Sequence, residues 1–294
     1  MKILNLLFLA VCWPFATSAF AGDFQVTTAF QTTVGPYKDS AQRDKISSMG
    51  VFISADYLER WGITIGASHT DVLFKPGFPD TAQDAIFASG RWSLTPDGLG
   101  GFLAARIDGH AIDNDDPSRN TDDLRAFAPQ ISYLTYEKDF YLDLGYAHST
   151  YFNDFKVTQL TPTVGFAMNQ GATWIRLRGY FITPSQPARA QGKEKTSAVE
   201  FKIMRWLAPR RPFGIETVQL ALLSGERILA VDSDAGAVYN VADLQEGSLS
   251  FGLEWLLLWN AKLLLNGSFE KYTNIGIGNA YQGQSVSVSL LKEW

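Results

Sequence analysis

The sequence is nearly free of cysteine. Its single cysteine among 294 residues, Cys12, falls in an amino-terminal leader that we expect to be removed. The mature chain, residues 22–294, would then have no thiol, which excludes a disulfide framework and a cysteine-ligated metal site. An exported protein without disulfides needs another way to hold its fold together.

The leader has the composition of a secretory signal peptide. A basic start precedes a mostly apolar run from Ile3 to Phe15, and small residues follow at Ala19 and Ala21, the positions that a signal peptidase reads. We therefore predict a signal peptide over residues 1–21, with an apolar core too short to span a membrane as a helix. The alternative is a lipoprotein signal with its lipid on Cys12, but the valine before that cysteine is large for such a site.

The sequence also lacks an excess of basic residues and long apolar runs. Without the leader it has 24 Lys and Arg against 30 Asp and Glu, a net charge of −6, which excludes a generally basic nucleic-acid binder. Beyond the leader, no apolar stretch reaches the roughly 20 residues of a membrane helix; the longest candidate, Leu253–Leu258, contains Glu254. No linker-like segment, nucleotide fingerprint or phosphate-binding glycine loop is present, so we expect one domain and no cofactor.

What the sequence does contain is a recurring two-residue alternation. Val51, Ile53 and Ala55 alternate with Phe52, Ser54 and Asp56, which is typical of a strand with one apolar and one polar face. About fourteen segments show this pattern, with 12 or 16 as alternative counts. They lie near residues 23–34, 47–59, 62–73, 84–95, 101–112, 126–137, 139–150, 155–167, 172–183, 196–208, 214–224, 244–258, 261–272 and 281–294.

The connections between these segments alternate in length. Short turns are expected near residues 60–61, 96–98, 138–139, 169–171, 209–212 and 259–260, and longer polar loops at 35–46, 74–83, 113–125, 184–195, 225–243 and 274–280. Short turns at one end and long loops at the other are typical of a transmembrane β-barrel, with turns periplasmic and loops outside. A sheet can cross hydrocarbon only if it closes, because an open edge leaves backbone groups unpaired. The pattern predicts an all-β fold, a single closed antiparallel barrel over residues 22–294, with both termini periplasmic.

The last strand carries a specific resemblance. Val286, Val288 and Leu290 alternate toward the terminal Trp294, and Lys292 departs from the pattern. The chain resembles bacterial outer-membrane β-barrel proteins, whose last strand commonly ends on an aromatic residue after alternate apolar residues. The resemblance implies a Gram-negative outer-membrane location and contact with outer-membrane lipid and lipopolysaccharide. It also implies that the barrel-assembly machinery recognises Val286, Val288, Leu290 and Trp294.

Aromatic residues gather near the expected strand ends, where rings suit a membrane interface. The turn-side set is Trp61, Trp92, Trp206, Trp259 and Trp294, and the loop-side set is Tyr146, Tyr151, Phe152, Phe155, Tyr272 and Tyr281. The alternative is a soluble all-β protein in which these rings form the core.

If the apolar face meets lipid, charged residues on the other face point into the lumen. The residues expected to line it are Arg91, Arg106, Asp108, His110, Arg176, Arg178, Glu200, Lys202, Glu254 and Lys262. In an open channel such charges sort solutes, and inward arginines would favour small polar or anionic ones. If they pair across the interior, they close the barrel, which would then act in export, assembly or surface interaction. A transporter of apolar substrates is less favoured, because no segment for an amino-terminal plug precedes the first strand.

The three histidines are the groups to examine for an outer-membrane hydrolase, the third possibility. His148 and Ser149 are adjacent on a strand and point to opposite faces, so they cannot form a nucleophile–base pair. His69 shares a face with Asp71, and His110 with Asp108; both pairs are expected to be ordinary polar residues near the rim. The acidic stretch 109–116 lacks the ligand spacing of a calcium loop. We therefore expect no catalytic residues and no metal site.

Overall fold

The computed structural model describes residues 23–58, 60–116, 119–207 and 214–294. The predicted signal peptide, residues 1–21, and the turn expected at 209–212 lie outside these residues. Among the described residues, no helix is long and apolar enough to cross a membrane.

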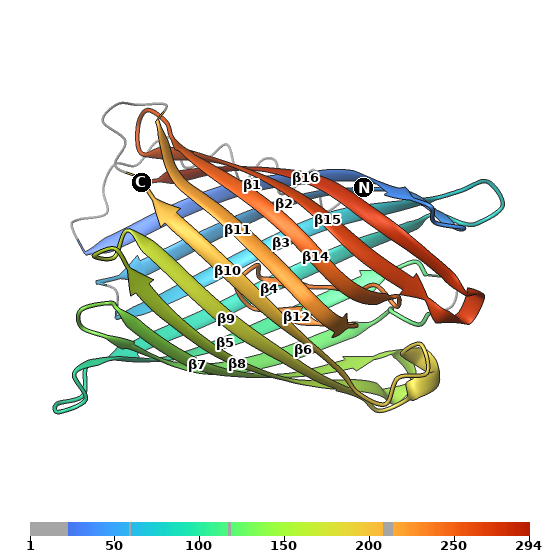
Figure 1. Cartoon of the computed structure of the whole chain (residues 1–294), viewed down its shortest axis with the longest axis horizontal. Helices are drawn as coiled ribbons and strands as arrows, with labels where there is room; N and C mark the ends of the chain where they lie inside the picture. The colour runs from blue at the N-terminus through green and yellow to red at the C-terminus, as the bar shows by residue number, and fades with distance from the viewer. Residues whose placement is uncertain (1–22, 59, 117–118, 208–213) are drawn as a thin grey trace.

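Fourteen long antiparallel strands form a single closed sheet (Figure 1). They are β1 (Phe24–Lys38), β2 (Arg43–Tyr57), β3 (Trp61–Phe74), β4 (Thr81–Leu94), β5 (Gly101–Asn114), β6 (Leu124–Thr135), β7 (Phe140–Tyr151), β8 (Phe155–Met168), β9 (Thr173–Pro184), β10 (Thr196–Trp206), β11 (Ile215–Arg227), β14 (Leu244–Leu256), β15 (Ala261–Asn274) and β16 (Asn279–Glu293). Two short strands, β12 (Val231–Asp232) and β13 (Ala237–Val238), pair only with each other.

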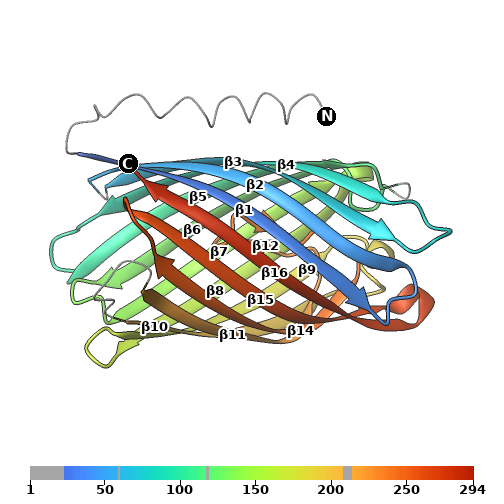
Figure 2. The ribbon, with the colours of Figure 1, turned by 90° about the horizontal axis from the view of Figure 1, so that it is seen from above.

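The first and last strands meet along most of their length. β1 pairs with β16 from Thr27 opposite Glu293 to Lys38 opposite Gln282, and Figure 2 shows the two strands side by side. Each of the fourteen strands therefore has two neighbours, and the wall has no free edge. The prediction of a closed, all-β, fourteen-stranded antiparallel barrel is confirmed.

Side chains alternate between the two faces of this wall. Residues paired in register point to the same side, as Thr33 and Ser287 do, whose hydroxyls lie 2.7 Å apart inside the barrel. The opposite parity places large apolar side chains on the outer surface, where they are accessible. This outer apolar band includes Phe30, Ile53, Ile63, Ile65, Ile86, Ile107, Ile131, Leu142, Leu144, Leu177, Phe201, Leu220, Leu249, Phe251, Val286 and Val288. Such a band is stable in contact with hydrocarbon, because apolar side chains have no hydrogen-bonding groups that need a partner there.

The prediction of aromatic residues at the two interfaces holds for Trp61 and Trp92 at one end of the barrel and is wrong for four of the six residues at the other. At the turn-side end, where β1 begins and β16 ends, Trp61 pairs with Trp92 on the outer face and stacks on Tyr57 with ring centroids 5.6 Å apart. At the loop-side end, four of the expected interface residues are buried inside: Tyr151, Phe155, Tyr272 and Tyr281. Their positions have inward parity, which the sequence pattern near the rim did not resolve.

Several loop-side connections are also shorter than predicted. The loop expected over 35–46 reduces to residues 39–42, because β1 continues to Lys38 and β2 begins at Arg43. The loop expected over 274–280 is a single short turn, Ile275–Ile277. Beyond the lipid band neither face of a strand needs to be apolar, so backbone pairing continues where the alternation in the sequence has faded.

The connection between β11 and β14 is the largest departure. The sequence predicted an external loop at 225–243, but residues 228–243 fold into the barrel and carry the β12–β13 hairpin (Figure 1). Ile228, Leu229, Ala230 and Val231 are buried there. They pack in one hydrophobic cluster with wall residues that include Leu124, Tyr151, Phe155, Tyr180 and Ile182. We refer to residues 228–243 as the lumen hairpin.

Candidate channel lumen

The strand register places all ten predicted lumen residues on the inward face. Across the β4–β5 ladder Arg91 pairs with Arg106, and across the β9–β10 ladder Arg178 pairs with Glu200 and Arg176 with Lys202. Glu254 and Lys262 share inward parity on β14 and β15. Their role toward a solute stays a prediction, but their partners are defined by the structure.

Arg176 and Arg178 hold the tip of the lumen hairpin through Asp234. Arg178 donates to the Asp234 carboxylate at 3.2 Å, and Arg176 also contacts it while donating to Glu200 at 2.8 Å. Burial alone would raise the pKa of Asp234, but Arg178 and Arg176 outweigh burial and hold that pKa well below its usual range. These arginines are therefore engaged with the protein's own carboxylates.

Arg106 contacts the hairpin from β5. Arg106 donates to Asp108 at 2.7 Å and to the Ser233 backbone carbonyl at 2.6 Å. His110 lies against the Phe87 ring, with centroids 5.0 Å apart, and does not pair with Asp108. The His110–Asp108 pairing considered from sequence is therefore replaced by an Arg106–Asp108 ion pair.

Further charged pairs lie toward the turn-side end. Arg91 donates to Asp56 at 2.6 Å. Lys262 on β15 lies 3.1 Å from both Glu254 and Glu216, which lie on the adjacent strands β14 and β11. Among the described residues, Lys202 forms no ion pair within 4.0 Å, although Glu200 lies two positions away on the same face.

Neutral contacts complete the docking of the lumen hairpin. The buried Gln159 side chain accepts from the Val231 backbone N–H at 3.0 Å and donates to the Val231 carbonyl at 2.7 Å. This arrangement satisfies both polar groups of a strand residue that has only one β neighbour. Asn240 donates to the Gln83 side chain at 2.9 Å. The hairpin is thus fastened to β4, β5, β8 and β9.

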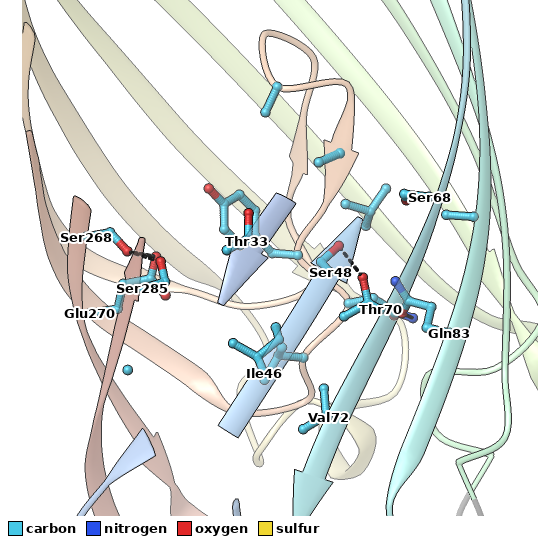
Figure 3. A pocket seen from close by; sticks show the side chains of 18 of the residues that line it. Thr33, Ile46, Ser48, Ser68, Thr70, Val72, Gln83, Ser268, Glu270 and Ser285 are labelled. Carbon is cyan, nitrogen blue, oxygen red and sulfur yellow. Dashed lines mark hydrogen bonds between the residues drawn. The ribbon is translucent and has the colours of Figure 1, made fainter. Parts of the chain in front are cut away.

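The rest of the lumen contains a cavity of about 650 Å³. It is bounded by the loop-side halves of β1 to β4 and β14 to β16, by the ends of β5 and β11, and by the lumen hairpin. Figure 3 shows hydroxyl side chains projecting into it from both sides of the β1–β16 seam. Those labelled there are Thr33, Ser48, Ser68, Thr70, Ser268 and Ser285.

A cluster of tyrosines lies near the loop-side mouth of this cavity. Asp243, where the hairpin returns to β14, accepts from Tyr281 at 2.5 Å and forms an ion pair with Arg43 at 3.1 Å. Tyr272 stacks on Tyr281, with centroids 5.3 Å apart, and Tyr37 meets Tyr281 edge-on at 5.8 Å. The cluster ties the hairpin to β2, β15 and β16.

The other two histidines lie on the outer face. His69 contacts Asp84 at 2.8 Å and Asp71 at 3.3 Å, and it pairs in register with outward Met49. His148 pairs with outward Phe127, whereas Ser149 is buried inside. The two therefore point to opposite sides of the wall, as strand geometry requires. Within the described ranges, no three His, Cys, Asp or Glu residues gather in a metal-binding arrangement.

The carboxy-terminal residues lie on the outer surface. Val286, Val288 and Leu290 are accessible there. The Trp294 backbone N–H donates to the Val26 carbonyl at 2.9 Å, so the last residue continues the pairing with β1. Lys292, the charged residue that interrupts the apolar alternation, lies 5.1 Å from the Trp294 ring centroid and makes a cation–π contact with it.

The sequence reasoning missed the lumen hairpin and the hydroxyl-lined cavity. A signal for the hairpin was available, because Ile228 to Val231 is an apolar run inside a segment interpreted as an external loop. The sequence indicates the hydroxyl groups of the cavity less clearly. Inward Ser and Thr residues recur on neighbouring strands, but only the strand register shows which of them lie next to each other.

The sequence matches no protein-family model and no curated protein. Among solved structures, it is similar to the Pseudomonas putida toluene transporter TodX, with 8% identity over 93% of this chain and 90% of that chain and a TM-score of 0.58. It is also similar to a bacterial polysaccharide outer membrane secretin, with 9% identity, 94% and 100% coverage and a TM-score of 0.56. Identities this low show the fold alone. Together with the closed wall, they show that the chain has the fold of the bacterial outer-membrane β-barrels.

Proposed function

We propose that the protein is an integral outer-membrane channel for the passive, weakly selective passage of small polar solutes. The observation that carries this proposal is the polar cavity of about 650 Å³ left beside the lumen hairpin. Its size falls in the range of roughly 300–1,000 Å³ typical of small-molecule sites. The hairpin sets an upper limit on the size of solute, because it occupies the side of the lumen bounded by β5 to β10.

The contacts argue against a strong anion preference. Each inward arginine in the described ranges has a carboxylate, carbonyl or amide oxygen as a partner, as Arg91 has Asp56 and Arg227 has the Gln245 side chain. A paired guanidinium attracts a passing anion less than a free one does. The anion preference stays a prediction from the sequence, and the proposal itself concerns polar solutes in general.

The proposed orientation is supported by the position of the first and last strands. β1 begins and β16 finishes at the same end of the barrel, which we place in the periplasm, with the loop-side end outside. An epitope inserted in the loop at 185–195 would then be accessible to antibody on intact cells, and one inserted in the turn at 136–139 would not. The reverse labelling would contradict this orientation.

A planar-bilayer recording tests the channel directly. We expect small, discrete current steps from the purified mature protein. A variant with residues 229–240 replaced by a short Gly-Ser linker should give steps several-fold larger, because it removes the material that narrows the lumen. Shortening the external loop at 75–80, which lies away from the hairpin, is the matched control and should leave the step size unchanged.

The second candidate is a non-conducting barrel that acts in export, assembly or surface interaction. The observation that favours it is the hydrophobic cluster that joins the lumen hairpin to the wall, because such packing fills the part of the interior next to β5 to β10. Folded protein that produces no current steps, while the linker variant does, would replace the channel proposal with this one.

A lipid-surface hydrolase is the third candidate. His110 is the inward histidine, and Asp108 is engaged by Arg106 rather than by His110. Lipid substrates should therefore remain intact in the presence of either the wild type or a His110→Ala variant. Hydrolysis that His110→Ala abolishes would contradict the proposal of a channel without catalytic residues.

A further inference from the structure

Hydroxyl groups on the cavity wall meet in pairs across neighbouring strands. Ser48 lies 2.8 Å from Thr70, and Ser268 lies 2.8 Å from Ser285. Two hydroxyls together offer two donors and four acceptor lone pairs, and their mutual hydrogen bond uses one of each. Ser48 also donates to the His69 backbone carbonyl at 3.2 Å, and Ser268 donates to Glu270 at 3.4 Å. Both donors of each pair are therefore used within the protein, and each pair keeps three acceptor positions for another molecule.

An aromatic contact lies deeper in the same cavity. The Phe52 and Phe87 rings meet edge-on, with centroids 6.3 Å apart, and both line the cavity. Phe52 can lie across β3 because Gly66 has no side chain; a Cβ there would be 2.3 Å from the ring. The cavity thus combines hydroxyl-bearing sides with an apolar ring surface.

The charges around the cavity are already satisfied by protein groups. Arg43 pairs with Asp243, and Glu200 with Arg176. Glu270 accepts hydrogen bonds from Tyr272 and from Ser268. An anion entering here would lose hydration without meeting a free cation, and burial of an unpaired charge is costly. A cation would have to compete with the hydrogen bonds that Glu270 already accepts.

We infer that this cavity is a binding site for an uncharged, polyhydroxylated solute of the sugar or polyol class; the inference rests on the proposed channel function and names its solute. Every hydroxyl of such a solute carries a donor, which matches the acceptor positions that the Ser and Thr pairs leave unused. Its C–H surface suits the half-buried Phe52 ring, which the buried Phe87 ring supports from behind. A buried site of hydrogen-bonding groups discriminates against solutes that cannot complete it.

Single-channel recording with a neutral disaccharide tests the inference. We expect sucrose or maltose, added to a conducting wild-type channel, to interrupt the current in a concentration-dependent way. The sugar acid gluconate and the cationic sugar glucosamine should interrupt it less at the same concentration.

A matched pair of variants assigns the effect to the cavity. The double variant Ser48→Ala and Thr70→Val removes one hydroxyl pair nearly isosterically, and should raise the half-blocking sugar concentration by about fivefold, as expected for one lost hydrogen bond. Ser54 and Thr64 form the same kind of pair, 2.9 Å apart, on the same two strands but outside the cavity lining. The variant Ser54→Ala and Thr64→Val should leave the half-blocking concentration unchanged, and circular dichroism checks that both variants fold.

The outcomes separate this inference from the function on which it rests. Current steps that neutral sugars do not interrupt, or equal effects of the two double variants, would overturn the sugar site and leave the channel in place. Protein without any current steps would overturn both.

Discussion

At the residue scale, Asp234 is the group on which docking of the lumen hairpin most depends. Its carboxylate contacts both Arg176 and Arg178, and because Arg178 is buried, the loss of this partner is costly. Asp234→Asn should loosen the hairpin tip and increase both the size and the noise of the current steps. Ser233→Ala is the control, because Arg106 uses only the backbone carbonyl of Ser233. Identical recordings from the two variants would argue against a role for the Asp234 ion pairs in docking the hairpin.

The pH dependence of docking follows from the same carboxyl. The pKa of Asp234 is lowered in the folded protein, so its contribution is fully present above the undocked value of about 3.9 and is lost as pH falls below it. The wild-type current should therefore keep its step size from pH 7 to about pH 5 and become noisier only below about pH 4. In Asp234→Asn the step size should lack this acid transition; a transition near neutral pH in the wild type would implicate another group.

Gly66 gives a prediction about packing. Gly66→Ala places a methyl group 2.3 Å from the Phe52 ring, so the ring must move or the strand must shift. Overpacking of this kind typically costs about 1–3 kcal/mol. Gly90→Ala, on the adjacent β4, meets no atom within 4 Å and serves as the control. Urea unfolding of the two variants in detergent should show a lower midpoint for Gly66→Ala alone.

At the element scale, the strands could be predicted from sequence and the lumen hairpin could not. A strand that meets lipid on one side and water on the other has apolar residues at every second position. Ile63 and Ile65 on β3 are an example. The hairpin lies inside the barrel, where it contacts the inward faces of several strands and bounds the cavity. Its partners, such as Gln159 on β8 and Arg178 on β9, are distant in sequence, so no local period records the contact.

The same reasoning covers the candidate site. Inward parity identified Arg106, Arg176 and Arg178 as interior residues, because charge against lipid is costly. Parity could not show that they hold Asp234 and the Ser233 carbonyl rather than facing a water-filled path. Those contacts exist only because residues 228–243 fold into the barrel rather than away from it.

Hydrogen exchange distinguishes the lumen hairpin from an external loop. The Val231 amide donates to Gln159, and the Tyr239 amide donates to the Ala230 carbonyl at 2.8 Å. Both amides should exchange slowly, at rates closer to those of the wall strands than to those of the external loop 185–195. Fast exchange at Val231 with slow exchange in the wall would show that the hairpin spends its time outside the lumen.

At the scale of the whole molecule, closure depends on the last strand reaching the first. Trp294 pairs with Val26 through its backbone, and its ring N–H donates to the Thr28 hydroxyl at 3.2 Å. We expect Trp294→Ala to lower the amount of folded protein in the outer-membrane fraction several-fold, as recognition by the assembly machinery would require. Trp259→Ala removes an equally large ring that is 83% exposed on the neighbouring turn, and should leave the amount unchanged.

The hydroxyl-lined cavity straddles the junction between the two ends of the chain. Gln31 and Thr33 of β1 face it beside Ser285 and Ser287 of β16, so one side of the cavity is built from residues more than 250 positions apart. The cavity is therefore complete only once the first and last strands have paired. A chain in which they had not paired would have an open sheet there, with no enclosed site for a solute.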